Sequence, residues 1–165
     1  MNDRIRDPFP GIFVGAGGVF GRADFLKDCP FDPNYPSLFS GEELLLSACL
    51  FTYGWDLYNP SVSVVFHKYK DSTNNVPVPV HWDNTLKSVK RLKYQLGVSE
   101  ETPDESVIID ADKFKMGNVR SLKLYYEYAG LDWVAKKLDF PFCNFRSEKK
   151  YHIQHPSVDP LPILK

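Results

Sequence analysis

Three groups of residues in this sequence could take part in chemistry. Gly17 and Gly18 follow an apolar run, and glycines let a ligand approach the backbone closely. Glu42 and Glu43 head a leucine-rich stretch, and carboxylates are strong hydrogen-bond acceptors. His67 ends a second apolar run, where a neutral imidazole could bind a metal ion. Each group also admits a purely structural interpretation.

The glycine cluster in GIFVGAGGVFG, residues 11–21, has two interpretations. The dinucleotide-binding fingerprint needs glycines at its first, third and sixth positions, but the sixth position counted from Gly15 is Phe20. A proline-rich loop follows where that fingerprint needs a strand ending in an acidic residue. The alternative is a tight turn or bulge, since glycine tolerates positive φ, and it stays open.

The acidic residues have two interpretations as well. Glu42 and Glu43 could simply favour the helix dipole in the first turn, by about 0.3–1 kcal/mol each. Alternatively, one of them points across the glycine turn and accepts hydrogen bonds from sugar hydroxyls. Asp110 and Asp112 follow an apolar run and could hold a divalent ion at a strand end. For that pair we favour the structural interpretation, in which both carboxylates are solvated where the strand passes into a loop, since short motifs often match by chance.

The histidines give a weak signal by themselves. A histidine that ends a strand, such as His67, is usually a satisfied structural residue and is less often a metal ligand. His152 and His155 have metal-like spacing only in a helix, and Pro156 argues against one there. We therefore expect both of them to be surface residues.

Composition limits the class of protein. The chain has 165 residues, a formal net charge of -1 and 43% hydrophobic residues, which fits one domain with a packed core. The charge disfavours a dedicated binder of nucleic acid or anionic membranes. No stretch approaches the ~20 apolar residues of a membrane helix, and the N-terminus has no apolar signal core. Cys29, Cys49 and Cys143 form no CxxC pair, which suits free thiols in a reducing compartment.

Hydrophobic periodicity predicts the elements that must position these residues. Strands are expected at 12–20 and in two short pieces within 55–69, and helices at 22–29, 41–54, 82–97, 118–130 and 132–138. The helix caps are expected at Ser40 and Gly54, at Asp83 and Gly97, and at Asn118 and Gly130. In the helix at 82–97, Leu86, Val89, Leu92 and Leu96 are expected to face the core, with Arg91 and the lysines largely off that face.

Five short motifs occur in a fixed order at residues 17–20 (GGVF), 30–33 (PFDP), 39–43 (FSGEE), 52–60 (TYGWDLYNP) and 67–69 (HKY). This series resembles the C-terminal half of the catalytic domain of polypeptide N-acetylglucosaminyltransferases, a family that includes cytoplasmic enzymes modifying hydroxyproline. Residues 116–133 (MGNVRSLKLYYEYAGLDW) resemble the family's closing segment. The resemblance covers about residues 8–137 and leaves 138–165 as an irregular C-terminal tail.

The resemblance implies an α/β fold: a partial GT-A-like fold with a short mixed sheet and flanking helices. The related polypeptide N-acetylgalactosaminyltransferases share the glycine pair, the Gly-Glu pair and the histidine. By that likeness, Gly17, Gly18 and Gly41 would bind substrate, with the glycine pair letting the backbone approach the donor sugar. Glu42 and Glu43 would be the catalytic carboxylates. Glu42 would also bind sugar hydroxyls, and His67 would bind a divalent cation, Mn²⁺ or Mg²⁺.

The activity that the resemblance implies is retaining, metal-dependent transfer of N-acetylglucosamine or a related sugar. The donor would be a UDP-sugar, the acceptor a protein or peptide hydroxyl, and the location cytoplasmic. A cation neutralises the charge that develops on the departing diphosphate, and an imidazole completes its shell without adding charge.

The chain also departs from the family pattern. The family's Asp-x-Asp metal motif precedes the glycine pair, whereas Asp110-Ala111-Asp112 follows it, and HKYKDST lacks the usual arginine after the histidine. From this we expect a fragment, a truncated product or one half of a split enzyme, inactive or very weak without its N-terminal half. Two alternatives stay open: a degenerate relative that binds carbohydrate or a protein partner without catalysis, and a small dinucleotide-binding module.

Overall fold

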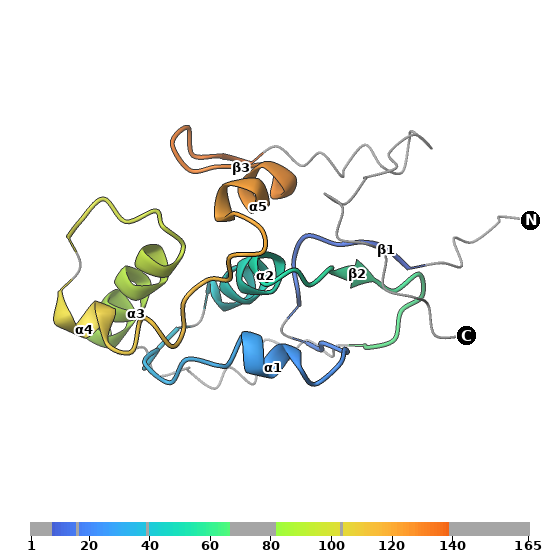
Figure 1. Cartoon of the computed structure of the whole chain (residues 1–165), viewed down its shortest axis with the longest axis horizontal. Coiled ribbons are helices and arrows are strands. Elements are labelled where there is room, and N and C mark those ends of the chain that lie inside the picture. Colours follow the sequence, from blue (N-terminus) through green and yellow to red (C-terminus); the bar gives the residue numbers. More distant parts are fainter. Residues whose placement is uncertain (1–7, 16, 39, 67–81, 103, 139–165) are drawn as a thin grey trace, which may run out of the picture.

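The computed structural model describes residues 8–15, 17–38, 40–66, 82–102 and 104–138. Three helices of two turns or more dominate it: α2 (Glu42–Thr52), α3 (Trp82–Gln95) and α5 (Leu122–Ala129). Two single-turn helices and four two-residue strands accompany them: α1 (Phe25–Asp28), α4 (Glu105–Ile108), β1 (Phe9–Pro10), β2 (Tyr58–Asn59), β3 (Leu131–Asp132) and β4 (Lys137–Leu138). Helix α2 lies at the centre, with α3 and α4 on one side and the β1–β2 pair on the other (Figure 1).

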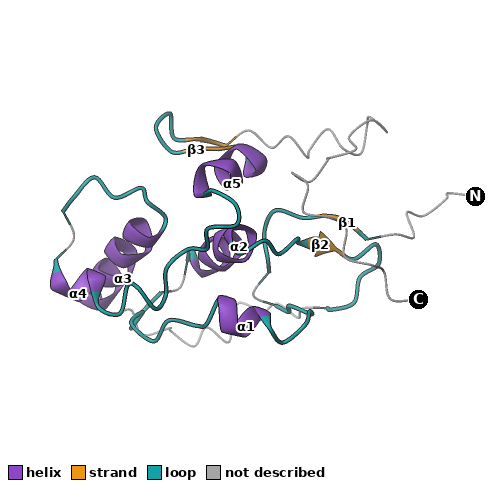
Figure 2. Cartoon of the chain, in the orientation of Figure 1, coloured by secondary structure: helices purple, strands orange, loops and turns teal. Residues whose placement is uncertain are grey.

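The strands form two separate antiparallel pairs. Phe9 is paired with Asn59 in β1–β2, and Leu131 with Leu138 in β3–β4. Loops make up most of the chain between the helices (Figure 2). The predicted α/β class is confirmed, with two small antiparallel sheets among the described residues in place of one mixed sheet.

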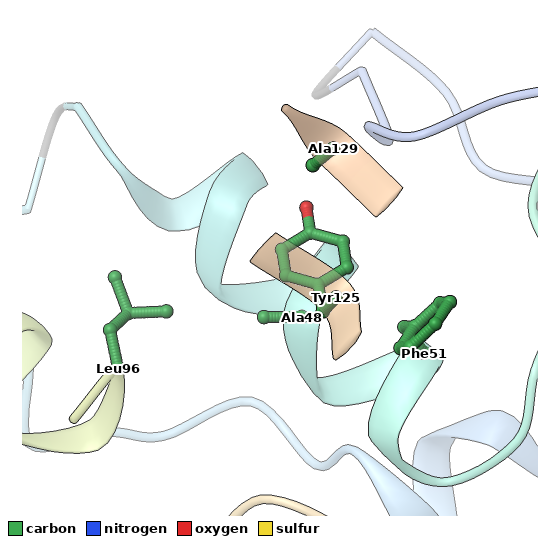
Figure 3. Close-up of a cluster of buried hydrophobic side chains, with 5 residues drawn as sticks. All are labelled: Ala48, Phe51, Leu96, Tyr125 and Ala129. Atoms are coloured by element: carbon green, nitrogen blue, oxygen red, sulfur yellow. The ribbon is translucent and has the colours of Figure 1, made fainter. Parts of the chain in front are cut away.

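The core forms where α2 packs against α5. Ala48 and Phe51 of α2 meet Tyr125 and Ala129 of α5, and Leu96 enters from the end of α3 (Figure 3). Because the two alanines are small, the helices approach closely enough for large rings to interdigitate. The ring centroids of Phe51 and Tyr125 lie 5.4 Å apart and tilted, a favourable arrangement for an aromatic pair.

Polar side chains of the same two helices hold the segment that leads into the glycine cluster. The Tyr125 hydroxyl donates to the carbonyl of Ile12 at 3.1 Å. The backbone N–H of Val14 donates to Oγ of Ser47 at 2.9 Å. Buried polar groups need such partners, so these two bonds fix where the chain enters the glycine turn.

Glycines end the helices as the sequence predicts. Gly54 has φ 91°, its N–H donates to Phe51 and the next N–H donates to Leu50, which is the Schellman pattern. Gly97 and Gly130, with φ 65° and 68°, follow the ends of α3 and α5 in the same left-handed region.

The predicted N-terminal caps are wrong by one to three residues. Helix α2 begins after Gly41, whose φ is 103°, and not after Ser40. A Cβ at Gly41 would collide with Leu92 of α3, so close helix packing decides that boundary. The cap of α5 is Ser121, whose hydroxyl accepts from Leu124 N–H, and not Asn118. Helix α3 begins at Trp82, before the expected cap Asp83.

Four predicted elements differ in type from those observed. The described residues of the strand expected at 12–20 are irregular, apart from the isolated bridge between Gly15 and Gly18. Residues 62–66 form no strand, because Pro60 ends the pairing with β1 and these apolar side chains stay exposed. Residues 132–138 form the β3–β4 hairpin and not a helix, since Asp132 Oδ1 accepts from Ala135 N–H and Lys136 takes φ 51°. The apolar run before Asp110 lies in α4 and not in a strand.

The buried face of α3 is rotated from its predicted position. Leu92 and Leu96 contact the core as predicted, but Leu86 is 59% exposed. Arg91, which the pattern places off the apolar face, is only 1% exposed. A charged side chain is buried this deeply only when it is paired, so α3 must have an acidic partner nearby.

Gly117 supplies a prediction about stability. A Cβ on Gly117 would lie 2.6 Å from the backbone carbon and oxygen of Thr52, which cannot yield as a flexible side chain would. We expect Gly117→Ala to lower the free energy of unfolding by at least about 2 kcal/mol, through overpacking against rigid backbone. Urea unfolding followed by circular dichroism would measure this.

The matched control for that experiment is Gly21→Ala, where the new methyl would meet Phe25 at an ordinary 4.0 Å. It should change stability by no more than about 0.5 kcal/mol. Equal losses for the two variants would contradict the close packing at Gly117.

The buried tyrosines predict a loss of stability in alkali. Burial raises the pKa of Tyr128 to about 12 and also raises the pKa values of Tyr125 and Tyr126 above their usual range. Above about pH 10 the unfolded chain releases these protons before the folded one, so the free energy of unfolding falls as pH rises. Thermal unfolding between about pH 9 and pH 11 should show the decline, and Tyr128→Phe should make it shallower. A midpoint independent of pH would contradict the burial.

Candidate active site

The glycine cluster forms a tight turn. Gly18 N–H donates to the carbonyl of Gly15 at 3.2 Å, and the two residues form an isolated antiparallel bridge. The next helix begins only at Phe25, so no helix N-terminus opens at the glycines as a dinucleotide site requires. The turn interpretation is therefore confirmed over the dinucleotide one. A Cβ on Gly17 would meet nothing within 4 Å, so the backbone is open to an approaching ligand.

The second apolar run lies beside this turn. A Cβ on Gly18 would lie 3.8 Å from Cγ2 of Val65, two residues before His67. His67 itself lies outside the described residues, so its role as a metal ligand stays a prediction. What the structure does bring together is the glycine pair and the run that leads into this histidine.

The carboxylates lie on the same side of the molecule as the glycine turn. Glu42 and Glu43 occupy the first turn of α2, are exposed, and line one cavity of about 370 Å³ together with Val19. Val19 directly follows Gly18, whereas Gly17 and Gly18 are not themselves among the lining residues. The remaining lining residues are Cys29, Pro30, Phe31, Asp32, Tyr35, Leu38, Leu45, Leu46, Cys49, Gln95, Phe114 and Met116.

A buried ion pair that the sequence analysis did not assign holds one wall of this cavity. Nε and Nη2 of Arg91 lie 2.7 and 2.6 Å from Oδ2 of Asp32, and both side chains are at least 95% buried. Gln95 donates to the same carboxylate at 2.9 Å and accepts from the Tyr35 hydroxyl at 2.7 Å. Arg91 also donates to the Val107 carbonyl at 2.7 Å, which ties α4 to α3. The aspartate of the PFDP motif is therefore an anchor for residues 30–35.

The aspartate of the TYGWDLYNP motif is paired too. Asp56 accepts from Nη2 of Arg120 at 2.7 Å, and the guanidinium lies over the Phe51 ring at 4.8 Å. Arg120 also donates to the carbonyl of Trp55 at 3.3 Å. Two motifs separated by 64 residues are thus joined directly. The available sequence signals were Arg91, four residues before Gln95, and Arg120, directly before the helix cap Ser121. Neither signal identifies the acidic partner in a single sequence.

Other candidate groups have structural roles or lie at the surface. Asp110, with φ 53°, and Asp112 are exposed in the turn after α4, so the solvated interpretation is favoured. The described residues contain no group of three histidine, cysteine, aspartate or glutamate side chains suited to a metal ion. A hydrogen bond with Cys49 and burial raise the pKa of Cys29, which keeps its thiol protonated and poorly nucleophilic.

Comparison with known proteins identifies the family of the chain. A family model described as Glycosyltransferase (GlcNAc) matches residues 1–135. The chain therefore belongs to this glycosyltransferase family. Membership supports a glycosyltransferase-like function. No curated protein and no solved structure matches it. Within the described part of the chain, none of the helices is both long and apolar enough to span a membrane.

The Asp32–Arg91 pair predicts which motif aspartate matters most for folding. Asp32→Ala leaves a buried guanidinium without its counter-charge, which should cost about 3–5 kcal/mol of unfolding free energy. Asp56 is about one-third exposed, so water can replace its carboxylate and Asp56→Ala should cost less. Chemical unfolding of both variants would measure the difference.

Asp24→Ala is the control, since Asp24 also contacts two basic side chains but at the surface. It should be nearly neutral, as exposed ion pairs contribute about 0–1 kcal/mol. If Asp32→Ala left the free energy of unfolding unchanged, the ion pair would not be holding the cavity wall.

Proposed function

We propose that this chain acts in the transfer of N-acetylglucosamine, or a related sugar, from a UDP-sugar to a hydroxyl of a protein or peptide. The proposal is supported by the family match over residues 1–135 and by one structural observation. That observation is the shared cavity of Glu42, Glu43 and the residue that follows the open glycine turn. The hydroxyproline-modifying GT-A type suggested by the motif order is part of the same proposal.

The roles of the residues follow from their chemistry. A carboxylate of Glu42 accepts hydrogen bonds from sugar hydroxyls, and Glu43 lies next to it in the same helical turn. Gly17 leaves space for the sugar to approach the backbone, since no side chain stands there. Such fixed contacts hold the anomeric carbon where an acceptor hydroxyl can reach it. Gly41, proposed to bind substrate, also sets the start of the helix that carries both carboxylates.

The cation belongs to the proposal as well. Mn²⁺ or Mg²⁺, when bound, would neutralise the charge that develops on the departing diphosphate. His67 would hold it through one neutral ring nitrogen, and the closeness of Val65 to Gly18 supports placing this run near the sugar. Retention of anomeric configuration is proposed by family likeness alone.

Saturation-transfer NMR with UDP-N-acetylglucosamine tests the assignment directly. Protons of the sugar should receive saturation from the chain, because the proposed contacts are to the sugar. Glu42→Gln should weaken this binding about 10–100-fold, as expected for losing a hydrogen bond to a charged group. Glu105→Gln, an exposed carboxylate in the first turn of α4, is the matched control and should bind normally.

Gly17→Ala is a second, independent variant for the same measurement. The structure has room for its methyl group, so folding should be unchanged while a sugar lying on the turn is displaced. Normal sugar binding by both Glu42→Gln and Gly17→Ala would contradict the proposed sugar-binding site. Sugar binding without any transfer to a peptide hydroxyl in the presence of Mn²⁺ would instead identify a non-catalytic relative.

A further inference from the structure

The cavity beside Glu42 and Glu43 is mostly apolar, which a sugar site alone does not require. Its mouth carries Phe31, 74% exposed, and Val19, 45% exposed. Leu38, Leu46, Phe114 and Met116 are among the side chains that line it further. Its volume of about 370 Å³ is typical of pockets that enclose an organic ligand. Carboxylates therefore stand at one edge of a space whose walls favour an apolar group.

The walls are held in place without a ligand. On one side, the buried pair of Asp32 with Arg91 fixes the residues that carry Phe31. On the other side, Gly117 N–H donates to Thr52 Oγ1 at 2.9 Å, and this fixes the segment that carries Met116. A preformed cavity binds more tightly than one that must be ordered first, because less conformational entropy is lost.

The sugar is a poor occupant of this space. Each sugar hydroxyl placed against these walls would lose hydrogen bonds to water without replacement. The acetyl group of N-acetylglucosamine offers a single methyl, which leaves most of the volume unfilled. An apolar side chain of the acceptor suits these walls better, while the sugar stays at the carboxylates.

We propose that this cavity is an acceptor subsite, which takes a large apolar side chain of the peptide next to the hydroxyl that receives the sugar. The inference rests on the proposed function and adds to it a preference in the acceptor sequence. An aromatic or leucine side chain in the cavity would contact Phe31 at the mouth and Met116 on the lining. Its neighbouring hydroxyl would then lie on the side of Glu42 and Glu43.

The chain offers a selective probe of this cavity. It contains two methionines, Met1 and Met116, so methyl-labelled methionine gives two NMR signals, one of them from the cavity lining. The ligands are acetylated pentapeptides glycine–X–serine–glycine–glycine, with X either phenylalanine or asparagine. The phenylalanine peptide should shift the Met116 signal and bind at least about ten-fold more tightly, as burial of an aromatic side chain predicts.

Two variants decide where the peptide binds. Leu46 lines the cavity and lies outside the described core cluster, so Leu46→Trp fills the space with little change to the core. Leu46→Trp should abolish the preference for phenylalanine over asparagine. Val134→Trp, at a 96% exposed hairpin position, adds the same ring elsewhere and should leave the preference intact.

The outcomes separate this inference from the proposed function. A phenylalanine preference that survives Leu46→Trp, or that never moves the Met116 signal, overturns the subsite even if sugar is transferred. A preference that Leu46→Trp abolishes supports the subsite, even if UDP-N-acetylglucosamine fails to bind and the transferase assignment falls.

Discussion

The buried ion pair between Asp32 and Arg91 is the constraint on which the candidate site depends. Neither charge could be buried alone, because its lost hydration would not be replaced. Once paired, they bind the irregular residues 30–35 to α3 and, through the Val107 carbonyl, bind α4 as well. A loop that contains two prolines and has no secondary structure of its own thereby becomes a fixed wall of the cavity. The interaction specifies an arrangement and need not add much net stability compared with an apolar substitute.

Helix α2 connects this wall to the rest of the molecule. Its first turn presents Glu42 and Glu43, and its middle packs against α5. The carbonyl of its last residue, Thr52, accepts hydrogen bonds from the N–H groups of Val119 and Arg120. Glycines permit the two closest approaches: Gly41 beside Leu92, and Gly117 beside the backbone of Thr52. The carboxylates are therefore placed by a helix that is fixed at both ends, which suits the proposed role of orienting a sugar.

Several parts of this structure could be predicted because their causes are local. Helix periodicity and the left-handed glycines gave α2, α3 and α5 with correct C-terminal ends at Gly54, Gly97 and Gly130. The motif order led to the glycosyltransferase family, which the family match confirms. The glycine turn and the two glutamates were identified as candidates, but the cavity that both glutamates and Val19 line was not. A cavity depends on side chains from residues 19 to 116, and no local pattern encodes that combination.

The sequence by itself determined where α2, α3 and α5 stop and which family the chain belongs to. Those properties depend on neighbours along the chain or on motifs read in order. Only the tertiary structure decided that Arg91 is buried and Leu86 exposed, that residues 132–138 form a hairpin, and that two motif aspartates are structural. Burial and charge pairing are set by partners distant in sequence. A charged residue can be buried on any face of a helix, provided that its counter-charge lies against that face.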